Sequence, residues 1–214
     1  MKEPQIPIAR EGYPFIAFIA FVSLVFALLE YEFVSLIALL LTGFVCYFFR
    51  DPERITPAAD DAVVSPADGK VILVEKIFDD RFVNEHVYKV SIFMSVFEVH
   101  VNRLPFTGTV EKIQYTAGSF YAANTDQGSL SNEHCALILT TAKDLRYAVV
   151  QVAGLVARRI VCWAEKGDTV ESGSRFGLIR FGSRVDIYLP QKVQLEVRSG
   201  QRVRAGETII GFIP

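Results

Sequence analysis

The hydrophobic pattern opens with two long apolar runs close together. The first extends from Phe15 to Leu29 and the second from Phe33 to Phe49, with the polar triplet Glu30-Tyr31-Glu32 between them. A membrane-spanning helix needs about 20 apolar residues, or about 17 at the short end, so each run alone is marginal. Together they predict a tight helical hairpin in a membrane. A buried soluble helix pair and an interfacial anchor are the alternatives.

Charged residues around the two runs predict the orientation of this hairpin. Lys2 and Arg10 precede the first run, Arg50 and Arg54 follow the second, and the turn carries only acids. Positively charged flanks favour the cytoplasmic side, so both ends are expected there. The linker Asp51–Pro57 holds two prolines that stop the second helix. We therefore expect an anchor over residues 1–49 and a second domain over residues 50–214.

Short apolar or alternating segments fill the chain beyond the linker. They are rich in β-branched residues, and no long segment has the 3.6-residue period of a helix. The pattern predicts a mostly-β domain with strands over residues 62–64, 70–76, 87–97, 108–115, 136–141 and 147–153.

A glycine-rich repeat closes the chain. Each copy predicts a strand, a tight turn with glycine at positive φ, and a second strand forming a hairpin with the first. Such hairpins resemble the barrel-sandwich folds of biotinyl and lipoyl carriers in architecture. The fold class expected is mainly β, a barrel-sandwich-hybrid-like domain preceded by an N-terminal α-helical membrane hairpin. The copies are Gly167, Val170, Gly173 and Gly177, and then Gly200, Val203, Gly206 and Gly211.

Composition narrows the classes of partner. Hydrophobic residues make up 51% of the chain and the mean hydropathy is +0.30, which is high for a purely soluble protein. A net charge of −2 gives no reason to expect a nucleic acid. Cys46, Cys135 and Cys162 share no close pairing or ligand spacing, and the chain has three histidines. We therefore expect reduced packing cysteines and no metal site.

The candidate chemistry lies in the pair Gly182-Ser183, which two apolar runs flank. Small residues at such a corner are usually a turn or a bulge. A serine after glycine can also attack the preceding carbonyl, because glycine has no side chain to block the approach. An N-to-O acyl shift, elimination and hydrolysis would then leave a pyruvoyl group on the new N-terminus. The residues alone permit this route without demanding it.

Four segments, in this order, resemble the short phosphatidylserine decarboxylases. The resemblance covers the chain from about Arg50 to the C-terminus. The segments are Ser65-Pro66-Ala67-Asp68-Gly69, Phe97-Glu98-Val99-His100-Val101-Asn102-Arg103, Asn132-Glu133 and Phe176-Gly177-Leu178-Ile179-Arg180-Phe181-Gly182-Ser183-Arg184-Val185-Asp186.

The resemblance implies a zymogen that cuts itself between Gly182 and Ser183, giving a β chain 1–182 and an α chain 183–214. The pyruvoyl group derived from Ser183 would form a Schiff base with the serine headgroup and act as an electron sink. The implied enzyme is a lyase of phospholipid biosynthesis that yields phosphatidylethanolamine and CO2. Its implied partner is phosphatidylserine in the cell membrane, with catalysis on the cytoplasmic face. No metal or external cofactor is implied, and a homo-oligomer is left open.

His100 and Asp68 complete the candidate catalytic set. Alternation places Glu98, His100 and Asn102 on one face of a strand, and imidazole is the usual acid or base near pH 7. Asp68 precedes a glycine, which by itself predicts a turn cap. The long bacterial relatives use the matching Asp with a His and the cleaved Ser as a triad. Arg103 stands where their second His would be, so the make-up of the triad stays open.

The remaining polar candidates have weaker signals. His134 is expected to be structural, whereas Gly118-Ser119-Phe120 and Asn132-Glu133 resemble segments that line the family's site. Two other functions stay open: a non-enzymatic carrier or adaptor, and a decarboxylase of archaetidylserine. A carrier should present a lysine at a hairpin tip, where this chain has Glu171-Ser172 and Arg204-Ala205. Candidates for binding a lipid phosphate or carboxylate are Arg158, Arg159, Arg175 and Arg180.

Overall fold

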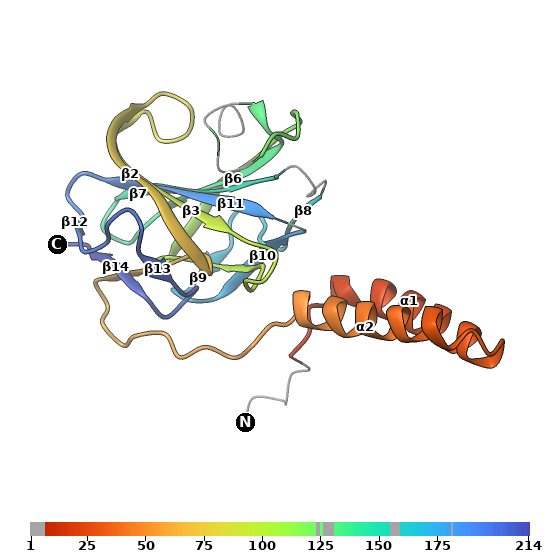
Figure 1. Cartoon of the computed structure of the whole chain (residues 1–214). Helices are drawn as coiled ribbons and strands as arrows, with labels where there is room; N and C mark the ends of the chain where they lie inside the picture. Colours follow the sequence, from red (N-terminus) through yellow and green to blue (C-terminus); the bar gives the residue numbers. More distant parts are fainter. Residues whose placement is uncertain (1–6, 123–124, 126–130, 155–158, 181) are drawn as a thin grey trace. The chain divides into compact units, whose positions relative to one another are not determined.

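Helices and strands belong to separate parts of the chain (Figure 1). The computed structural model describes residues 7–122, 125, 131–154, 159–180 and 182–214. The chain divides into a helical unit, Met1–Glu53, and a unit of strands, Arg54–Pro214. The expectation of a mainly-β protein with an N-terminal apolar helix is confirmed.

The helical unit is a hairpin. A short 3-10 turn, Arg10–Gly12, leads into α1 (Tyr13–Leu28), and α2 (Glu32–Phe48) returns beside it. Ser23 and Ser35 join the two helices, since each hydroxyl donates to the other's backbone carbonyl at 3.1 and 3.0 Å. Both hydroxyls thus have a backbone acceptor inside an otherwise apolar helix pair, as buried hydroxyls need.

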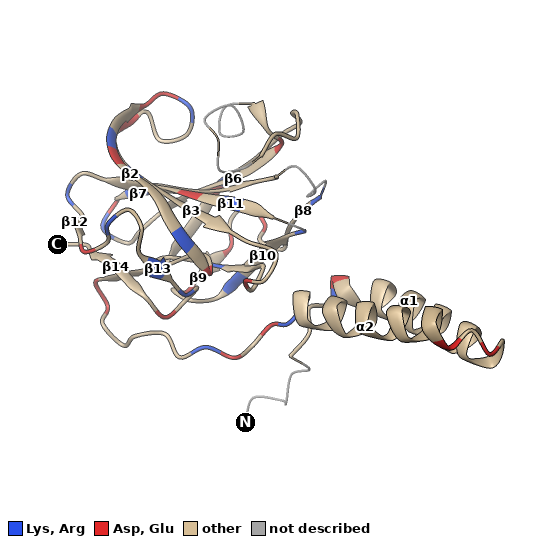
Figure 2. Ribbon diagram, viewed as in Figure 1, with Lys and Arg blue, Asp and Glu red and all other residues tan. Residues whose placement is uncertain are grey.

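The outer surface of the hairpin is apolar. Phe18, Leu28 and Phe33 are between 67% and 75% exposed. In the described part of this unit, charged residues lie only near the two ends of the helix pair (Figure 2). The segment Arg10–Leu28 has 19 residues and a mean hydropathy of 1.9, so it is long and apolar enough to cross a membrane, whereas α2 is shorter.

Among the described residues, eight strands form one antiparallel sheet in the order β13-β2-β3-β11-β7-β6-β5-β9. Strand β11 lies near its centre, paired with β3 on one side and β7 on the other. The strands are β2 (Gly69–Asp79), β3 (Glu85–Met94), β5 (Gly108–Thr116), β6 (His134–Thr140), β7 (Arg146–Val152), β9 (Thr169–Val170), β11 (Ser183–Pro190) and β13 (Arg202–Val203).

Two smaller antiparallel sheets complete the strand unit in its described part, in the orders β1-β14-β12 and β4-β10-β8. The second of them contributes Asn102, on β4, to the site described below. The strands are β1 (Ala62–Val64), β4 (Val101–Arg103), β8 (Ile160–Cys162), β10 (Arg175–Ile179), β12 (Gln194–Leu195) and β14 (Ile209–Phe212).

The glycine-rich repeats make turns but not the expected hairpins. Gly173 and Gly206 adopt the predicted positive φ, +76° and +72°. However, β9 pairs with β5 while β10 pairs with β4 and β8, and β13 pairs with β2 while β14 pairs with β1 and β12. Each turn therefore passes the chain from one sheet to another. The glycine of each turn bonds a residue outside the turn. The Gly173 N–H donates to the Leu104 carbonyl and the Gly206 N–H donates to the Ser65 carbonyl, both at 2.8 Å.

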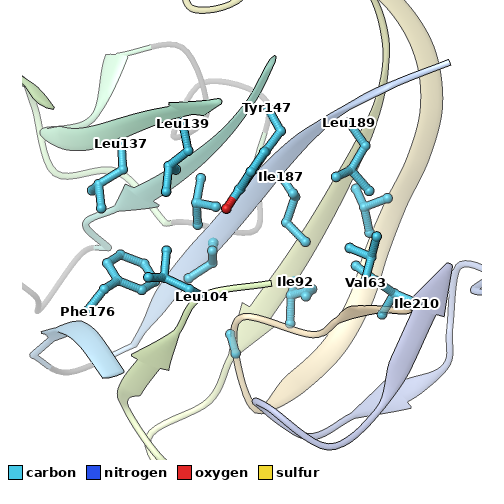
Figure 3. Packing of buried hydrophobic residues seen from close by; sticks show 14 of the residues in the cluster. Val63, Ile92, Leu104, Leu137, Leu139, Tyr147, Phe176, Ile187, Leu189 and Ile210 are labelled. Carbon is cyan, nitrogen blue, oxygen red and sulfur yellow. The ribbon is translucent and has the colours of Figure 1, made fainter. Parts of the chain in front are cut away.

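The core lies between the large sheet and the two small ones. Side chains alternate along β11, so that Val185, Ile187 and Leu189 enter the main cluster of buried apolar residues, whereas Tyr188 joins a second cluster. Figure 3 shows Ile187 and Leu189 with Leu104 and Phe176 among the packed side chains. The inner face of β11 is thus fixed by the burial of its apolar residues, and the same alternation sets the direction of Ser183.

Candidate functional site

The candidate bond lies where the chain passes between two sheets. Strand β10 ends in the small sheet at Ile179, and β11 begins in the large sheet at Ser183. Gly182 makes this crossing with φ = +67°, a conformation that side-chain-bearing residues disfavour. A Cβ built at Gly182 would meet no atom within 4 Å. Backbone conformation, and not lack of space, therefore calls for glycine here.

His100 lies against this crossing and is 2% exposed. Its Nδ1 is 2.9 Å from the Glu98 carbonyl oxygen, and the Gly182 N–H donates to its Nε2 at 3.4 Å. A carbonyl only accepts and a backbone N–H only donates, so the ring is neutral with its proton on Nδ1. The lone pair of Nε2 faces the Gly182-Ser183 segment. The predicted base is thus beside the predicted bond in its basic form.

Ser183 is fully buried at the start of β11. Its position on the strand has the same parity as Val185, so the side chain points to the inner face of the sheet. Met94 is its direct partner on β3, and the Ser183 hydroxyl donates to the Met94 Sδ at 3.5 Å. A thioether is a weak acceptor, so this contact orients the hydroxyl at little cost to its release.

Two buried amides extend this contact. Asn102, on β4, donates through Nδ2 to the same Met94 sulfur at 3.5 Å. Gln151, on β7, donates through Nε2 to the Asn102 Oδ1 at 2.9 Å. Both amide side chains are completely buried. Sequence reasoning placed Asn102 on the face of His100 but overlooked Met94 and Gln151. The signal available was Gln151 itself, a lone polar residue in the apolar segment 147–153.

Asp68 lies in a buried network of its own. Its Oδ2 accepts from Arg54 at 2.8 Å and its Oδ1 from the Ala205 N–H at 2.7 Å. Arg54 also donates to Glu207 at 2.9 Å. Burial raises the pKa of the Asp68 carboxyl, against the opposing influence of the Ala205 N–H and of Arg54. The Nδ1 of His100, which a triad carboxylate would hold, lies instead at the Glu98 carbonyl.

The other face of β11 carries a buried ion pair directly after Ser183. Arg184 donates through Nε to Asp186 at 2.5 Å and through Nη2 to the Ser91 hydroxyl at 2.7 Å. Lys89 lies 3.9 Å from the second oxygen of Asp186. Both members of the pair are almost fully buried. This cluster ties the first residues of β11 to β3, so the strand is held firmly right up to the candidate bond.

The arginines predicted to bind a lipid phosphate or carboxylate lie in two different places. Arg159 and Arg180 flank the crossing, and the Arg180 N–H donates to the Arg159 carbonyl at 3.3 Å. Arg175 lies at the opposite end of β10, paired with Arg103. Arg103 is buried and donates to the Gly173 carbonyl at 2.9 Å, which favours a structural role for it. Arg158 lies outside the described residues.

The segment Asn132–His134 supports the loop beside the site. Asn132 joins two segments outside the strands, because its amide bonds both the backbone of Tyr121 and the Ala153 carbonyl at 2.7–2.8 Å. His134 bonds the Asn132 carbonyl through Nδ1 and Arg81 through Nε2, at 2.9 and 3.1 Å. These contacts agree with the structural role predicted for His134. Ser119 forms a parallel bridge with Asn132, which places the segment at 118–120 in the same loop.

The cysteines are all free thiols. Although the sequence spacing predicted no close pair, the side chains of Cys135 and Cys162 are hydrogen-bonded to each other. This bond and burial raise the pKa of Cys135, whereas the same bond lowers that of Cys162. Among the residues that the structure describes, no group of three or more His, Cys, Asp or Glu side chains could hold a metal ion.

Known proteins resemble this chain over its whole length. A sequence model of the phosphatidylserine decarboxylase family matches residues 41–211. The phosphatidylserine decarboxylase proenzyme of Desulfotalea psychrophila is 56% identical over 100% of both chains. Proenzymes of the same name from Syntrophotalea carbinolica and Oleidesulfovibrio alaskensis are 49% and 48% identical. The former match covers 100% of both chains, and the latter covers 98% of this chain and 96% of the relative. These matches favour the decarboxylase over the carrier alternative.

Proposed function

Because the chain belongs to the phosphatidylserine decarboxylase family, we propose that it is a proenzyme that cuts itself between Gly182 and Ser183. The matured protein then converts phosphatidylserine to phosphatidylethanolamine and CO2. The observation that carries this proposal is the hydrogen bond from the Gly182 N–H to the Nε2 of His100, beside the bond to be cut.

Self-cleavage begins with an acyl shift that moves one proton. His100 takes the proton of the Ser183 hydroxyl, the oxygen bonds to the Gly182 carbonyl carbon, and the carbon–nitrogen bond to Ser183 breaks. The proton passes from His100 to the released nitrogen, so an ester replaces the amide. General base help of this kind typically contributes about 10²–10⁴ in rate.

Elimination then separates the chains. A base accepts the Ser183 Cα proton as the Cβ–Oγ bond breaks, which releases the carboxylate of Gly182 and leaves a dehydroalanine. One water molecule converts this residue to a ketone and releases ammonia, which gives the pyruvoyl N-terminus. The buried bond of Arg184 to Ser91 on β3, and the pairing of β11 with β3 and β7, would keep β11 in the sheet after the cut.

The surroundings of Ser183 fit a pyruvoyl group. The small side chain is fully buried at the start of a central strand and lies beside a neutral histidine, which leaves a reactive carbonyl sheltered from bulk water. Such a ketone supplies an electron sink for the electrons left when CO2 departs. In the mature enzyme His100 would return a proton to the substrate carbon. Arg159 and Arg180, at the crossing, would attract the anionic lipid headgroup.

Asp68 enters this proposal as a positioning residue. Its turn contacts β4, because the Arg103 N–H donates to the Pro66 carbonyl at 2.9 Å, and β4 directly follows His100. The carboxylate is held by Arg54 and the Ala205 N–H. Asp68 would therefore fix the segment that carries His100, with the Glu98 carbonyl holding the tautomer that a triad carboxylate holds elsewhere.

The helical hairpin would anchor the enzyme to its lipid substrate. At 1.5 Å per residue, the 19 residues Arg10–Leu28 extend about 28 Å, close to the ~30 Å hydrocarbon thickness of a bilayer. The exposed apolar side chains of both helices need such surroundings. Lys2 and Arg10 before the hairpin, and Arg50 after it, favour the cytoplasmic face for both ends and for the catalytic unit.

The test is formation of phosphatidylethanolamine by the purified protein on vesicles containing phosphatidylserine. Wild type should form the product, and Ser183→Ala should remain uncut and inactive. Ser174→Ala is a matched control, because Gly173-Ser174 is another Gly-Ser pair whose glycine has positive φ. The Ser174 hydroxyl donates to the Glu171 carbonyl instead. Product formation by uncut Ser183→Ala at the wild-type rate would refute the proposal.

A further inference from the structure

Directly beside Ser183, a row of hydrogen-bonded side chains is buried between the large sheet and the small sheet β4-β10-β8. Hydrogen bonds connect its members from Gln151 to Asn102 at 2.9 Å, and from Asn102 to the Met94 sulfur at 3.5 Å. The Ser183 hydroxyl donates to the same sulfur at 3.5 Å. All four residues are 0% exposed. The row therefore links an amide on β7 to the candidate nucleophile on β11 through two other strands.

Burying a polar group at this depth costs free energy unless the group is fully hydrogen-bonded. Gln151 is in register with Val185 on β11 and faces the same apolar core. Its Nε2 bonds Asn102, but its Oε1 is buried without a hydrogen-bond partner among the described residues. An apolar residue at this place would avoid that cost. A buried acceptor without a partner is rare in native proteins and calls for an explanation, of which a role in catalysis is one.

The surrounding backbone makes room for this amide. Gly177 on β10 lies over Gln151, and a Cβ at Gly177 would approach the Gln151 Nε2 to 2.9 Å and the Val161 carbonyl oxygen to 2.2 Å. Asn102 is the cross-strand partner of Gly177. The bare glycine thus allows the amides of Asn102 and Gln151 to meet across the two sheets.

We propose that Gln151 and Asn102 are positioning residues for self-cleavage, an inference that rests on the function proposed above. Asn102 accepts from Gln151 through Oδ1, so its NH2 group must face the Met94 sulfur. That bond fixes the end of an otherwise flexible side chain. The fixed sulfur in turn sets the rotamer of the Ser183 hydroxyl that attacks the Gly182 carbonyl. Misplacement of an attacking atom by about 1 Å can cost 10²-fold in rate.

The direct test compares two nearly isosteric variants, Gln151→Met and Asn102→Leu, with Val149→Ala. Val149 is the next inward residue of β7 and is fully buried, so its truncation loosens the same core without touching the row. Chain separation is followed on denaturing gels, and thermal unfolding is followed by circular dichroism. Gln151→Met should cut roughly tenfold more slowly, equivalent to about 1.4 kcal/mol. Val149→Ala should melt earlier and cut at the wild-type rate.

Treatment with hydroxylamine adds a measurement, the fraction of chain released, that a purely structural role of Gln151 would leave unchanged. Hydroxylamine attacks the ester formed by the acyl shift and releases a chain that begins with unmodified Ser183. If the row aligns the hydroxyl, Gln151→Met lowers the fraction released in a fixed time while Val149→Ala does not. The double variant Gln151→Met with Asn102→Leu should cut no more slowly than the slower of the two single variants, because the two residues act in series.

The outcomes separate this inference from the function on which it rests. Wild-type cutting rates in folded Gln151→Met would overturn the positioning role and leave self-cleavage standing, as would an unchanged hydroxylamine-released fraction. If Asn102→Leu does not fold, Gln151→Met alone decides. A wild-type chain that stays whole would overturn both proposals together.

Discussion

Replacement of Gly182 by alanine tests whether the backbone at the crossing prepares the bond for attack. Gly182 has φ = +67°, and no atom lies within 4 Å of the position that a Cβ would take. The substitution therefore adds no steric clash with other residues. It changes only the cost of the left-handed conformation, which is about 1–2 kcal/mol for a residue with a side chain.

That cost translates directly into an expected rate. A penalty of 1–2 kcal/mol lowers the population of the observed conformation about 5–30-fold relative to its alternatives. If the acyl shift proceeds from this conformation, chain separation in Gly182→Ala should slow by the same factor. Gly182→Asn should be less affected, because asparagine enters the left-handed region more readily than alanine.

Gly200→Ala provides the matched control. Gly200 has φ = +91°, also with no atom within 4 Å of its Cβ position, and it precedes β13 in another part of the fold. Its alanine variant should lose similar stability and cut at the wild-type rate. The assay is a time course of the two chains on a denaturing gel. Wild-type cutting in Gly182→Ala, or equal slowing in Gly200→Ala, would refute the role given to this backbone conformation.

Three further predictions concern the base, the buried carboxylate and the anchor. His100→Ala should slow chain separation by roughly 10²-fold or more and also impair product formation by any matured fraction, since His100 is proposed for both steps; normal rates in both assays would remove it from the mechanism. Burial raises the pKa of Asp68, so the folded state holds that proton more tightly and the residue's contribution to stability falls as pH rises above about 3.9. The unfolding free energy of wild type minus that of Asp68→Asn, measured in urea, should therefore decrease from pH 4 upward; an increase would contradict the sign. In a background without native cysteines, Tyr31→Cys should react with an impermeant thiol reagent outside intact cells and Ala58→Cys should not, and the reverse pattern would contradict the proposed topology.

Elements whose signal is local could be predicted from the sequence. The two apolar runs gave the helical hairpin, and alternation gave β1, β5 and β7 to within a residue or two. The third strand was predicted too long, because Ser95–Phe97 form a turn in which the Glu98 N–H bonds the Ser95 carbonyl at 3.0 Å. Valine and phenylalanine favour strands, but here the turn towards His100 overrides that propensity.

Pairing between distant strands could not be predicted in this way. Alternation assigns a side chain to a face of its strand, but it does not identify what faces it across the core. Met94 is 89 residues from Ser183, and Asn102 is 49 residues from Gln151. The glycine repeats were misjudged for the same reason, since a tight turn can join strands of one sheet or of two.

Asp68 shows the same limit within the candidate site. Its sequence context offered a local turn cap or a triad member. The carboxylate instead reaches Arg54 in the linker and the Ala205 N–H, 137 residues away. His100 and Gly182, by contrast, were predicted as members of one site from their motifs, and the structure brings them to 3.4 Å.

The mass of the purified protein under denaturing conditions tests the central claim most directly. Self-cleavage with formation of the pyruvoyl group predicts two chains that correspond to residues 1–182 and 183–214. The smaller chain should be lighter than its encoded sequence by the mass of one ammonia molecule. A single chain with the full encoded mass from an active preparation, or a smaller chain that retains an unmodified Ser183 amine, would contradict the account.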